Sequence, residues 1–423
     1  FGERAEDAIV EEFKQLVHTE NVFQPKMFNS LTPKQRYLAL RAITLIKEKR
    51  DGKVKGRTVA DGSTQRDYIP PEQATSPTVS IEALLLTCVI DAMEERAVAV
   101  ADVSGAFLKT EMPEHDEDVT VVFEGKMVEL LLKTDPSYEK YVHITKAGKK
   151  ILYVRLKKAM YGCLKAARLF YDNLACQLES MGFTINRYDL CVANNIIDGK
   201  QCTVTWHVDD LKISHVNPKV VDRVIKQLED RYGKLSVTRG RKQTYVGMDI
   251  EYCIDKSVDI SMKPYLVESI DEFEVFGEKI DVSKPTPAAA YLFNVDEESP
   301  LLNEKKAKGF HKITAKLLFV CCRGRPDLNV TISFLTTRVS KPNDGDWKKL
   351  KRMLQYLYGT LDLVLKLSAF NTSIIKWWID ASYGVHDNMR SHTGTTMSLG
   401  RGSVYSRSTK QKLNTKSSIE SEV

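Results

Sequence analysis

Three carboxylates in this sequence follow stretches that are typical of buried strands. Polar and apolar residues alternate over 201–207, the pair Asp209-Asp210 follows, and an apolar run then continues. This pattern predicts a β-hairpin with two carboxylates at its tip. The short apolar stretch 97–101 ends in Asp102. If that strand lies beside the hairpin in one sheet, the three carboxylates converge at one edge.

Three carboxylates at one sheet edge favour a site for divalent cations, because a buried carboxylate is costly unless it is paired or binds metal. Their hard oxygen atoms suit Mg²⁺, or alternatively Mn²⁺, which takes its remaining ligands from water and substrate phosphates. Two such ions suit an in-line phosphoryl transfer, in which they activate a hydroxyl and stabilise a leaving pyrophosphate. An isolated Asp-Asp pair is more often a solvated turn. The apolar flanks and the distant Asp102 favour the metal site here.

Composition and charge restrict the class of protein. The 423 residues are 43% hydrophobic and 28% charged, as in ordinary globular proteins. No apolar run approaches the roughly 18–20 residues of a membrane span, so we expect no membrane partner. The eight cysteines lack zinc-site spacing, and we expect reduced thiols. Basic residues cluster over 140–168, 348–352 and 407–416. Such clusters suit a phosphate backbone, with a solvated surface as the alternative for each.

The elements that must position the carboxylates can be outlined from hydrophobic patterning. We expect helices over 79–93, 168–181 and 305–359, and strands over 151–156 and 374–380. The first 49 residues have a helical pattern, and an Asp-Gly pair just after them predicts a hairpin turn. A Pro-Thr-Pro sequence at 285–287 indicates a linker.

The order of several motifs resembles the reverse transcriptases of copia-type (Pseudoviridae) LTR retrotransposons. Trp206-His207-Val208-Asp209-Asp210 is similar to their YxDD box, with His207 in place of the usual Tyr. The other matching segments, in chain order, are 53–62 (fingers), 100–108 (the first aspartate), 156–168 (the LxKALYGLKQAPR sequence), 245–250 (FLGM-I) and 325–327 (TRPD). A metal-dependent nuclease or phosphatase is a weaker alternative, because it does not explain this order.

The resemblance implies roles for the matched residues. Asp102, Asp209 and Asp210 would be the catalytic metal ligands. The residues that would bind the incoming nucleotide are Lys55, Arg57, Phe107, Tyr161 and Gly162. Phe107 would press against the sugar and exclude a 2′-OH, which would select deoxynucleotides. Each role has an alternative. Phe107 could be a core aromatic and Lys55 an exposed charge of the hairpin. The Tyr161-Gly162 pair could be a corner between a strand and a helix.

The last part of the chain resembles the start of a ribonuclease H domain. Segment 378–383 is similar to the strand that carries the first catalytic aspartate, here Asp380, and 417–422 to the helix that carries a glutamate, here Glu420. The resembled site uses four carboxylates, and only two are matched. We therefore expect no ribonuclease H activity from these residues. The chain begins without Met and ends inside a predicted helix, so we expect a piece of a longer protein.

The resemblance implies an α+β fold built as a right-hand polymerase. Its parts would be a helical lead-in (1–44), fingers and a palm with an antiparallel sheet (45–275), a helical thumb or connection (276–368) and a truncated ribonuclease H-like domain (369–423).

The implied function is RNA-directed DNA synthesis, in which deoxynucleoside triphosphates extend a primer on an RNA or DNA template. The alternative is a catalytically silent remnant of a retroelement that binds nucleic acid or serves as a structural part of a particle. Integrase and capsid segments of the same polyprotein would be partners. The implied location is a cytoplasmic virus-like particle, with later entry into the nucleus.

Overall fold

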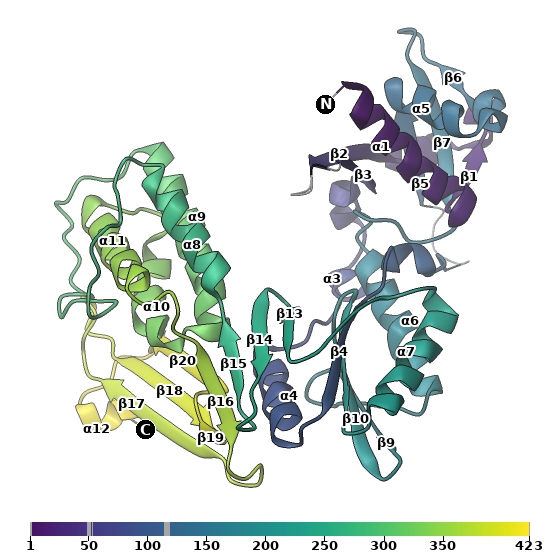
Figure 1. Cartoon of the computed structure of the whole chain (residues 1–423). Helices are drawn as coiled ribbons and strands as arrows, with labels where there is room; N and C mark the ends of the chain where they lie inside the picture. The colour runs from purple at the N-terminus through teal and green to yellow at the C-terminus, as the bar shows by residue number, and fades with distance from the viewer. Residues whose placement is uncertain (1, 49–51, 53, 114–118, 423) are drawn as a thin grey trace.

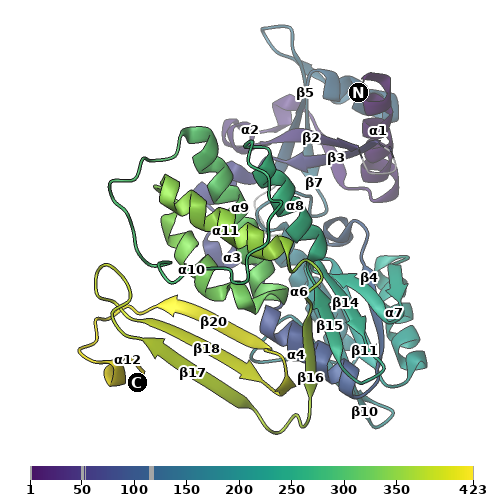
Figure 2. The same ribbon diagram turned by 60° about the vertical axis from the view of Figure 1, so that its left-hand side comes forward.

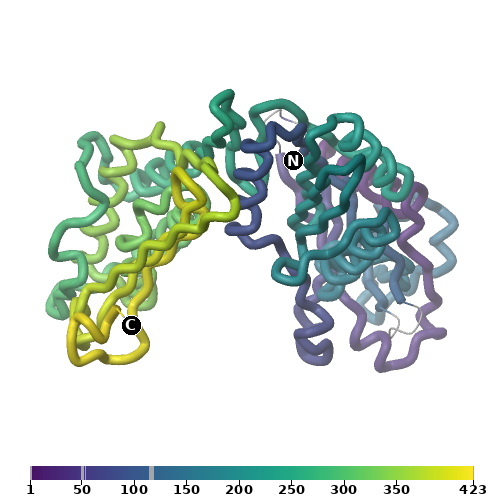
Figure 3. Tube along the Cα trace, turned by 90° about the horizontal axis from the view of Figure 1, so that it is seen from below, coloured from purple at the N-terminus to yellow at the C-terminus, as the bar shows by residue number. Residues whose placement is uncertain are grey.

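The computed structural model describes residues 2–48, 52, 54–113 and 119–422, which form four β-sheets and the helices that cover them (Figure 1). The two ends of the chain lie in different parts of the molecule. The C-terminal strands lie at one end of the molecule and the N-terminal segments at the other (Figure 3). The α+β class predicted from the sequence is confirmed. No helix within the described ranges is both long and apolar enough to span a bilayer.

The first sheet combines segments that lie far apart in the sequence. Its strands, in spatial order, are β1 (Phe23–Lys26), β7 (Lys150–Leu156), β5 (Thr120–Glu124), β2 (Leu40–Glu48) and β3 (Val54–Ala60), and β6 (His143–Ile144) pairs with β7. The helices near this sheet are α1 (Gly2–Lys14), α2 (Pro33–Leu38) and α5 (Lys126–Thr134). The tip between β2 and β3 includes residues 49–51 and 53, which lie outside the described residues.

The helical pattern expected over the first 49 residues is confirmed for α1 and α2 but is wrong for β1 and for β2. Leu40 is buried and pairs in parallel with Val121, and β1 pairs with β7. These partners lie roughly 80 to 130 residues further along the chain. Long-range pairing has therefore overridden a local pattern that favoured a helix.

The second sheet carries the three aspartates. Its strands, in spatial order, are β12 (Ser236–Arg239), β4 (Ala97–Asp102), β11 (Asp210–His215), β10 (Lys200–His207), β9 (Val192–Ile197) and β8 (Thr184–Ile185). Every pair in this sheet is antiparallel. The helices around it are α3 (Pro71–Ala74), α4 (Ile81–Met93), α6 (Ala166–Ser180) and α7 (Pro218–Tyr232). Helices α6 and α7 cover one face, and α4 lies on the other (Figure 1).

The elements of this region follow the sequence pattern closely. The predicted strand that ends in Asp102, the hairpin with Asp209 and Asp210, and the two predicted helices are confirmed as β4, β10–β11, α4 and α6. Alternate residues of β11 face opposite sides, so Leu211 and Ile213 enter the core that α7 covers. Lys212 faces α4 instead.

A third sheet links the second sheet to a helical region. Its strands are β13 (Lys242–Tyr245), β14 (Met248–Tyr252), β15 (Val258–Ser261), β16 (Leu365–Ala369) and β19 (Gly400–Arg401). The helices are α8 (Lys263–Glu274), α9 (Glu304–Gly324), α10 (Asn329–Arg338) and α11 (Asp344–Tyr358). The predicted helical region over 305–359 is thus confirmed. Helix α8 packs against α9, so the helical region begins upstream of residue 276.

The last sheet consists of β17 (Lys376–Ser382), β18 (His392–Ser398) and β20 (Tyr405–Lys410), and α12 (Ser418–Glu422) packs against β17. Figure 2 shows these strands below the helical region, where α10 contacts β20. The predicted strand over 374–380 is confirmed as β17.

Candidate active site

The backbone brings the three aspartates to one sheet edge. Asp102 at the end of β4 is the direct partner of Asp210 at the start of β11. Asp209 lies in the turn of the hairpin, where its carbonyl oxygen accepts a hydrogen bond of 3.1 Å from the N–H of Val103. All three residues are therefore held by backbone contacts between β4 and the β10–β11 hairpin.

The hairpin turn contains a strained residue. Val208, between His207 and Asp209, has a φ of +59°, which a β-branched side chain rarely adopts. Such a conformation costs about 1–3 kcal/mol and persists only where its surroundings enforce it. The buried Tyr245 of β13 supplies part of that enforcement, because its hydroxyl donates to the carbonyl oxygens of Asp210 (3.1 Å) and Thr205 (3.3 Å).

The surroundings of the carboxylates disfavour their negative charge. Burial raises the pKa of Asp209, and the charge of Asp102 raises it further, whereas Arg57 and His207 lower it. Burial and the charges of Asp209 and Asp102 raise the pKa of Asp210, which His207 also lowers. His207, the departure from the usual Tyr, pairs with Asp210 across the hairpin and is partly buried.

The chemistry of this edge fits a divalent cation. The donors are hard carboxylate oxygens, and a cation would offset the mutual repulsion that raises the pKa of two of them. Across the described residues, however, no group of three or more His, Cys, Asp or Glu side chains is arranged to hold a metal ion. The structure therefore brings the three residues together without a formed coordination shell.

The residues predicted to bind the nucleotide connect the first sheet to this edge. The guanidinium carbon of Arg57, on β3, lies 4.6 Å from the ring centroid of Tyr161. That ring is 4.7 Å from the ring of Phe107, which also lies 6.3 Å from Phe170. Phe107 is only partly buried, so part of this packing residue remains exposed. Lys55 is exposed two residues before Arg57 on the same strand.

Only glycine fits at position 162, where the segment after β7 passes close to the end of β3. Its φ is +90°, and a β-carbon at this position would overlap the carbonyl oxygen of Ala60 at the end of β3. The N–H of Ala60 donates to the carbonyl oxygen of Tyr161 at 2.8 Å. The Tyr161-Gly162 pair is thus a corner between β7 and α6, and this corner is fixed directly to the strand that carries Arg57.

The two residues matched to ribonuclease H lie on adjacent elements. Asp380 is exposed on β17, and Glu420 is exposed on α12, which packs against that strand. The carboxylate of Glu420 accepts a hydrogen bond of 2.6 Å from the backbone N–H of Lys416.

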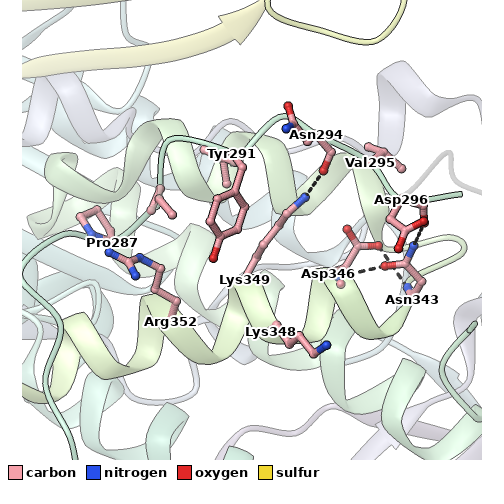
Figure 4. A pocket seen from close by; sticks show the side chains of 14 residues that line it. Pro287, Tyr291, Asn294, Val295, Asp296, Asn343, Asp346, Lys348, Lys349 and Arg352 are labelled. Carbon is pink, nitrogen blue, oxygen red and sulfur yellow. Dashed lines mark hydrogen bonds between the residues drawn. The ribbon is translucent and has the colours of Figure 1, made fainter. Parts of the chain in front are cut away.

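The basic cluster at 348–352 is largely engaged within the helical region. Lys351 pairs with Glu278 at 2.9 Å. Lys349 donates to the carbonyl oxygen of Asn294, and Arg352 to the hydroxyl of Thr286. Lys348, Lys349 and Arg352 line a pocket of about 390 Å³ between α11 and the loop at 287–296 (Figure 4). None of the three aspartates lines this pocket, so the cluster belongs to a different part of the molecule.

A buried ion pair beneath the β10–β11 hairpin escaped the sequence analysis. The ammonium group of Lys212, two residues after Asp210, contacts the carboxylate of Asp91 on α4, and both side chains are almost fully buried. Arg96 lies 3.8 Å from the same carboxylate, and the hydroxyl of Tyr252 donates to it at 3.4 Å. The signal in the sequence was Asp91 within the apolar run that ends α4, and Lys212 between Leu211 and Ile213 on β11.

Comparison with known proteins shows the family to which this chain belongs. A sequence profile described as reverse transcriptase (RNA-dependent DNA polymerase) matches residues 30–287, more than half of the chain. A retrovirus-related Pol polyprotein from transposon TNT 1-94 of Nicotiana tabacum is 24% identical over 89% of this chain. The transposon Ty1-DR6 Gag-Pol polyprotein of Saccharomyces cerevisiae is 23% identical over 91%. The chain spans only 27% and 21% of the lengths of these two relatives.

A solved structure of the foamy viral protease-reverse transcriptase, in complex with double-stranded DNA, has a similar fold. The TM-score is 0.53 and the sequence identity 14%. The match covers the whole of this chain and 59% of the viral chain.

Proposed function

The chain belongs to the copia-type branch of the reverse transcriptase (RNA-dependent DNA polymerase) family, and we propose that it extends a primer by template-directed addition of deoxynucleotides. The observation that carries this proposal is the register of the second sheet, between β4 and β11. It pairs Asp102 with Asp210 and places Asp209 in the adjoining turn. The proposed setting is an LTR retrotransposon.

We assign roles in this reaction to the side chains at the sheet edge. Asp102, Asp209 and Asp210 would hold divalent cations, Mg²⁺ or Mn²⁺. When bound, these ions supply activation of the primer hydroxyl and stabilisation of the leaving pyrophosphate. Burial of the hairpin excludes water from one side of the carboxylates, and the contacts of Val103 and Tyr245 fix their backbone positions. These contacts would keep the backbone that carries the carboxylates in place while the side chains adjust to the bound ions.

The residues on the other side of the site would bind the nucleotide. Arg57 is a fixed cation that interacts electrostatically with Asp209 and stacks on Tyr161, so it is suited to the triphosphate, with Lys55 beside it on the strand. Phe107 packs against Tyr161 and would place its ring where a ribose 2′-OH would lie. Gly162 keeps this wall close to β3.

The proposed partners are a primer annealed to an RNA or DNA template and deoxynucleoside triphosphates. The foamy viral protein of similar fold is described in complex with double-stranded DNA. Integrase and capsid segments are proposed as further partners, because the tobacco and yeast relatives compared above are Pol and Gag-Pol polyproteins. The proposed location is a cytoplasmic virus-like particle, with later nuclear entry.

We also propose that these 423 residues lack ribonuclease H activity. The resemblance to that domain matches Asp380 and Glu420 only, and both side chains are exposed. A labelled RNA–DNA hybrid incubated with the chain and Mg²⁺ should remain intact. Release of metal-dependent fragments from the RNA strand, absent from an Asp380→Asn variant, would overturn this part of the proposal.

Primer extension tests the polymerase. The chain is incubated with poly(rA)/oligo(dT), dTTP and Mg²⁺, beside an Asp209→Asn, Asp210→Asn double variant. Asp230→Asn serves as a matched control, because Asp230 is exposed on α7 and forms an ion pair with Lys226, one turn earlier. We expect extension by the parent and the control but not by the double variant. If none extends while all bind the duplex, the alternative of a silent nucleic-acid-binding or structural remnant is correct.

A further inference from the structure

The N-terminal segment 12–20 contacts both walls of the proposed nucleotide pocket. It begins in the last turn of α1 and continues through η1 (Gln15–Thr19), a short π-helix, to Glu20. One wall is β3 with Lys55 and Arg57, and the other consists of the Phe107 and Tyr161 segments. The side chains of Glu12 and Glu20 make the relevant contacts, and Gln15 lies between them. We call residues 12–20 the N-terminal brace.

Glu20 connects the segments that carry Phe107 and Tyr161. Its side chain is buried, with 5% of the residue exposed. One carboxylate oxygen accepts from the ammonium group of Lys109 at 2.5 Å, and the other from Lys158 at 3.3 Å. Lys109 lies two residues after Phe107, and Lys158 lies three residues before Tyr161. A single buried carboxylate therefore joins two segments whose aromatic rings touch.

Glu12 supports the opposite wall at an exposed sheet edge. Strand β3 is the last strand of its sheet, so the N–H groups on its outer side have no strand partner. A carboxylate oxygen of Glu12 accepts the N–H of Thr58, the residue after Arg57, at 3.2 Å. A β-carbon on Gly56 would lie 2.9 Å from the carbonyl oxygen of Ala8, so α1 rests directly on this strand.

Gln15 completes the brace between these two points. Its side-chain nitrogen lies 3.6 Å from the position that a β-carbon on Gly105 would occupy. Gly105 has a φ of +67° and forms the turn between Asp102 and Phe107. The brace thus contacts β3 beside Arg57 and the lysine after Phe107, and Gln15 lies near the turn before Phe107.

We propose that Glu20 and Glu12 are positioning residues that set the width of the nucleotide pocket. The inference deepens the proposed function and rests on it. The contacts of the two carboxylates end next to Arg57, Phe107 and Tyr161, and none of the interactions described for the brace includes Asp209 or Asp210. Loss of the brace should therefore weaken binding of the incoming nucleotide more than it slows the chemical step.

The decisive variant is Glu20→Gln, which keeps the size of the side chain and leaves two lysines without their carboxylate. We expect the KM for dTTP in primer extension to rise roughly tenfold, with kcat within about twofold of the parent, as for an interaction that acts on substrate binding. Glu11→Gln is the matched control, because Glu11 is exposed on α1 and pairs with Lys14 three residues later. It should leave both constants unchanged. An unchanged KM in Glu20→Gln, or an equal loss of kcat, would overturn the proposal.

A second pair of variants covers the case in which Glu20→Gln does not fold. Glu12→Ala removes the acceptor for the N–H of Thr58, whereas Glu12→Gln retains an acceptor of the same length. We expect Glu12→Ala to raise the KM for dTTP and Glu12→Gln to restore most of the parent value. Equal behaviour of the two variants would contradict a positioning role through that hydrogen bond.

Hydrogen exchange separates this inference from the polymerase proposal. In Glu20→Gln, the amides of residues 105–110 and 157–163 should exchange faster than in the parent, while those of β4, β10 and β11 should not change. This readout requires no catalysis. If the parent fails to extend a primer, the proposed function is wrong. If the parent extends it and the two segments keep their protection in the variant, the brace is wrong.

Discussion

Asp209 and Asp210 lie beside Asp102 in surroundings that raise the pKa of both carboxyl groups of the hairpin. Burial of these charges costs folding free energy. Val208, which joins β10 to Asp209, adds to that cost because its backbone is strained. Stability and function therefore oppose each other at these residues. A substitution that removes charge while keeping shape should reveal the opposition directly.

We expect Asp209→Asn to stabilise the fold at neutral and alkaline pH. The folded-state pKa of Asp209 is raised, so the favourable state is the protonated one, and that advantage is lost as the pH rises through the folded pKa. At pH 8 the ionised parent should be less stable than the Asn variant by about 1 kcal/mol, or about 1 °C in Tm for a chain of this length. Partial solvent exposure keeps the effect this small.

Thermal unfolding at pH 8 and at pH 4 checks this expectation. The difference between variant and parent should shrink toward pH 4, where the parent carboxyl becomes protonated. Asp230→Asn, on the exposed face of α7, should show no comparable gain at either pH. An Asn variant that is less stable than the parent at pH 8 would mean that the carboxylate makes a stabilising contact as an anion.

Phe107 provides the second prediction for a single residue. Its ring packs on Tyr161 at 4.7 Å and is only partly buried, which suits contact with the sugar of a nucleotide. Phe107→Val should reduce the preference for dTTP over UTP by about 10–100-fold, which is the effect of removing a few carbon atoms from a discriminating pocket. Phe107→Tyr keeps the ring and should retain the preference. Ratios of kcat/KM for the two nucleotides on one primer–template provide the measurement.

Single residues were predictable where they share a motif, but not where they only support one. The aspartates and Arg57, Phe107, Tyr161 and Gly162 were named from the sequence, and the structure brings them to one region. Tyr245 was part of a recognised motif, but nothing in the sequence indicated that its hydroxyl would hold the backbone of Asp210. A hydrogen bond between strands that are 35 residues apart depends on the fold and leaves no local pattern.

At the scale of elements, the hairpin β10–β11 depends on the contact between β11 and α4. The buried Lys212–Asp91 pair joins them, and Arg96 and Tyr252 add polar contacts around the same carboxylate. Lys212→Met leaves Asp91 buried without its main partner. We expect this single variant to lose about 3–5 kcal/mol of stability.

The double variant Lys212→Met, Asp91→Leu should recover much of that loss, because replacing a buried ion pair by apolar side chains is often nearly neutral. Urea unfolding of the parent, both single variants and the double variant provides the cycle. Losses that simply add in the double variant would show that the two charges do not interact. A single Lys212→Met variant as stable as the parent would contradict the role of the pair.

The elements that were predicted are those formed by neighbouring residues, and the elements that were missed depend on distant strands. Helices α4 and α6 and the β10–β11 hairpin form from neighbouring residues, and their periodicity predicted them. Strands β1 and β2 are stabilised by β5 and β7, so the local helical pattern was misleading for these two segments, although it correctly predicted α1 and α2. Because β2 continues into the hairpin with β3, Lys55 and Arg57 reach the site through this long-range pairing.

At the scale of the whole molecule, charge is nearly balanced and much of it is engaged internally. The chain has 62 Lys and Arg residues against 56 Asp and Glu, a net charge of +6. In the described part of the chain, Lys351 is engaged with Glu278 and Lys316 with Glu272. A count of basic residues therefore overstates the charge that a nucleic acid would meet. Only groups that are free to neutralise phosphates contribute to the dependence of binding on salt.

Binding of a primer–template duplex should nevertheless weaken steeply with salt. We expect the affinity to fall by about 10³–10⁵-fold between 50 and 200 mM KCl if six to ten phosphates are neutralised, as measured by fluorescence anisotropy of a labelled duplex. The slope of log affinity against log salt concentration measures the number of neutralised phosphates. This slope should be the same in the Asp209→Asn, Asp210→Asn variant, because carboxylates neutralise no phosphate. Lys351→Gln should also leave the slope unchanged, since its charge is already paired with Glu278. A slope that falls by one unit in Lys351→Gln would place α11 on the duplex, and a slope near zero for the parent would exclude the phosphate backbone as its main contact.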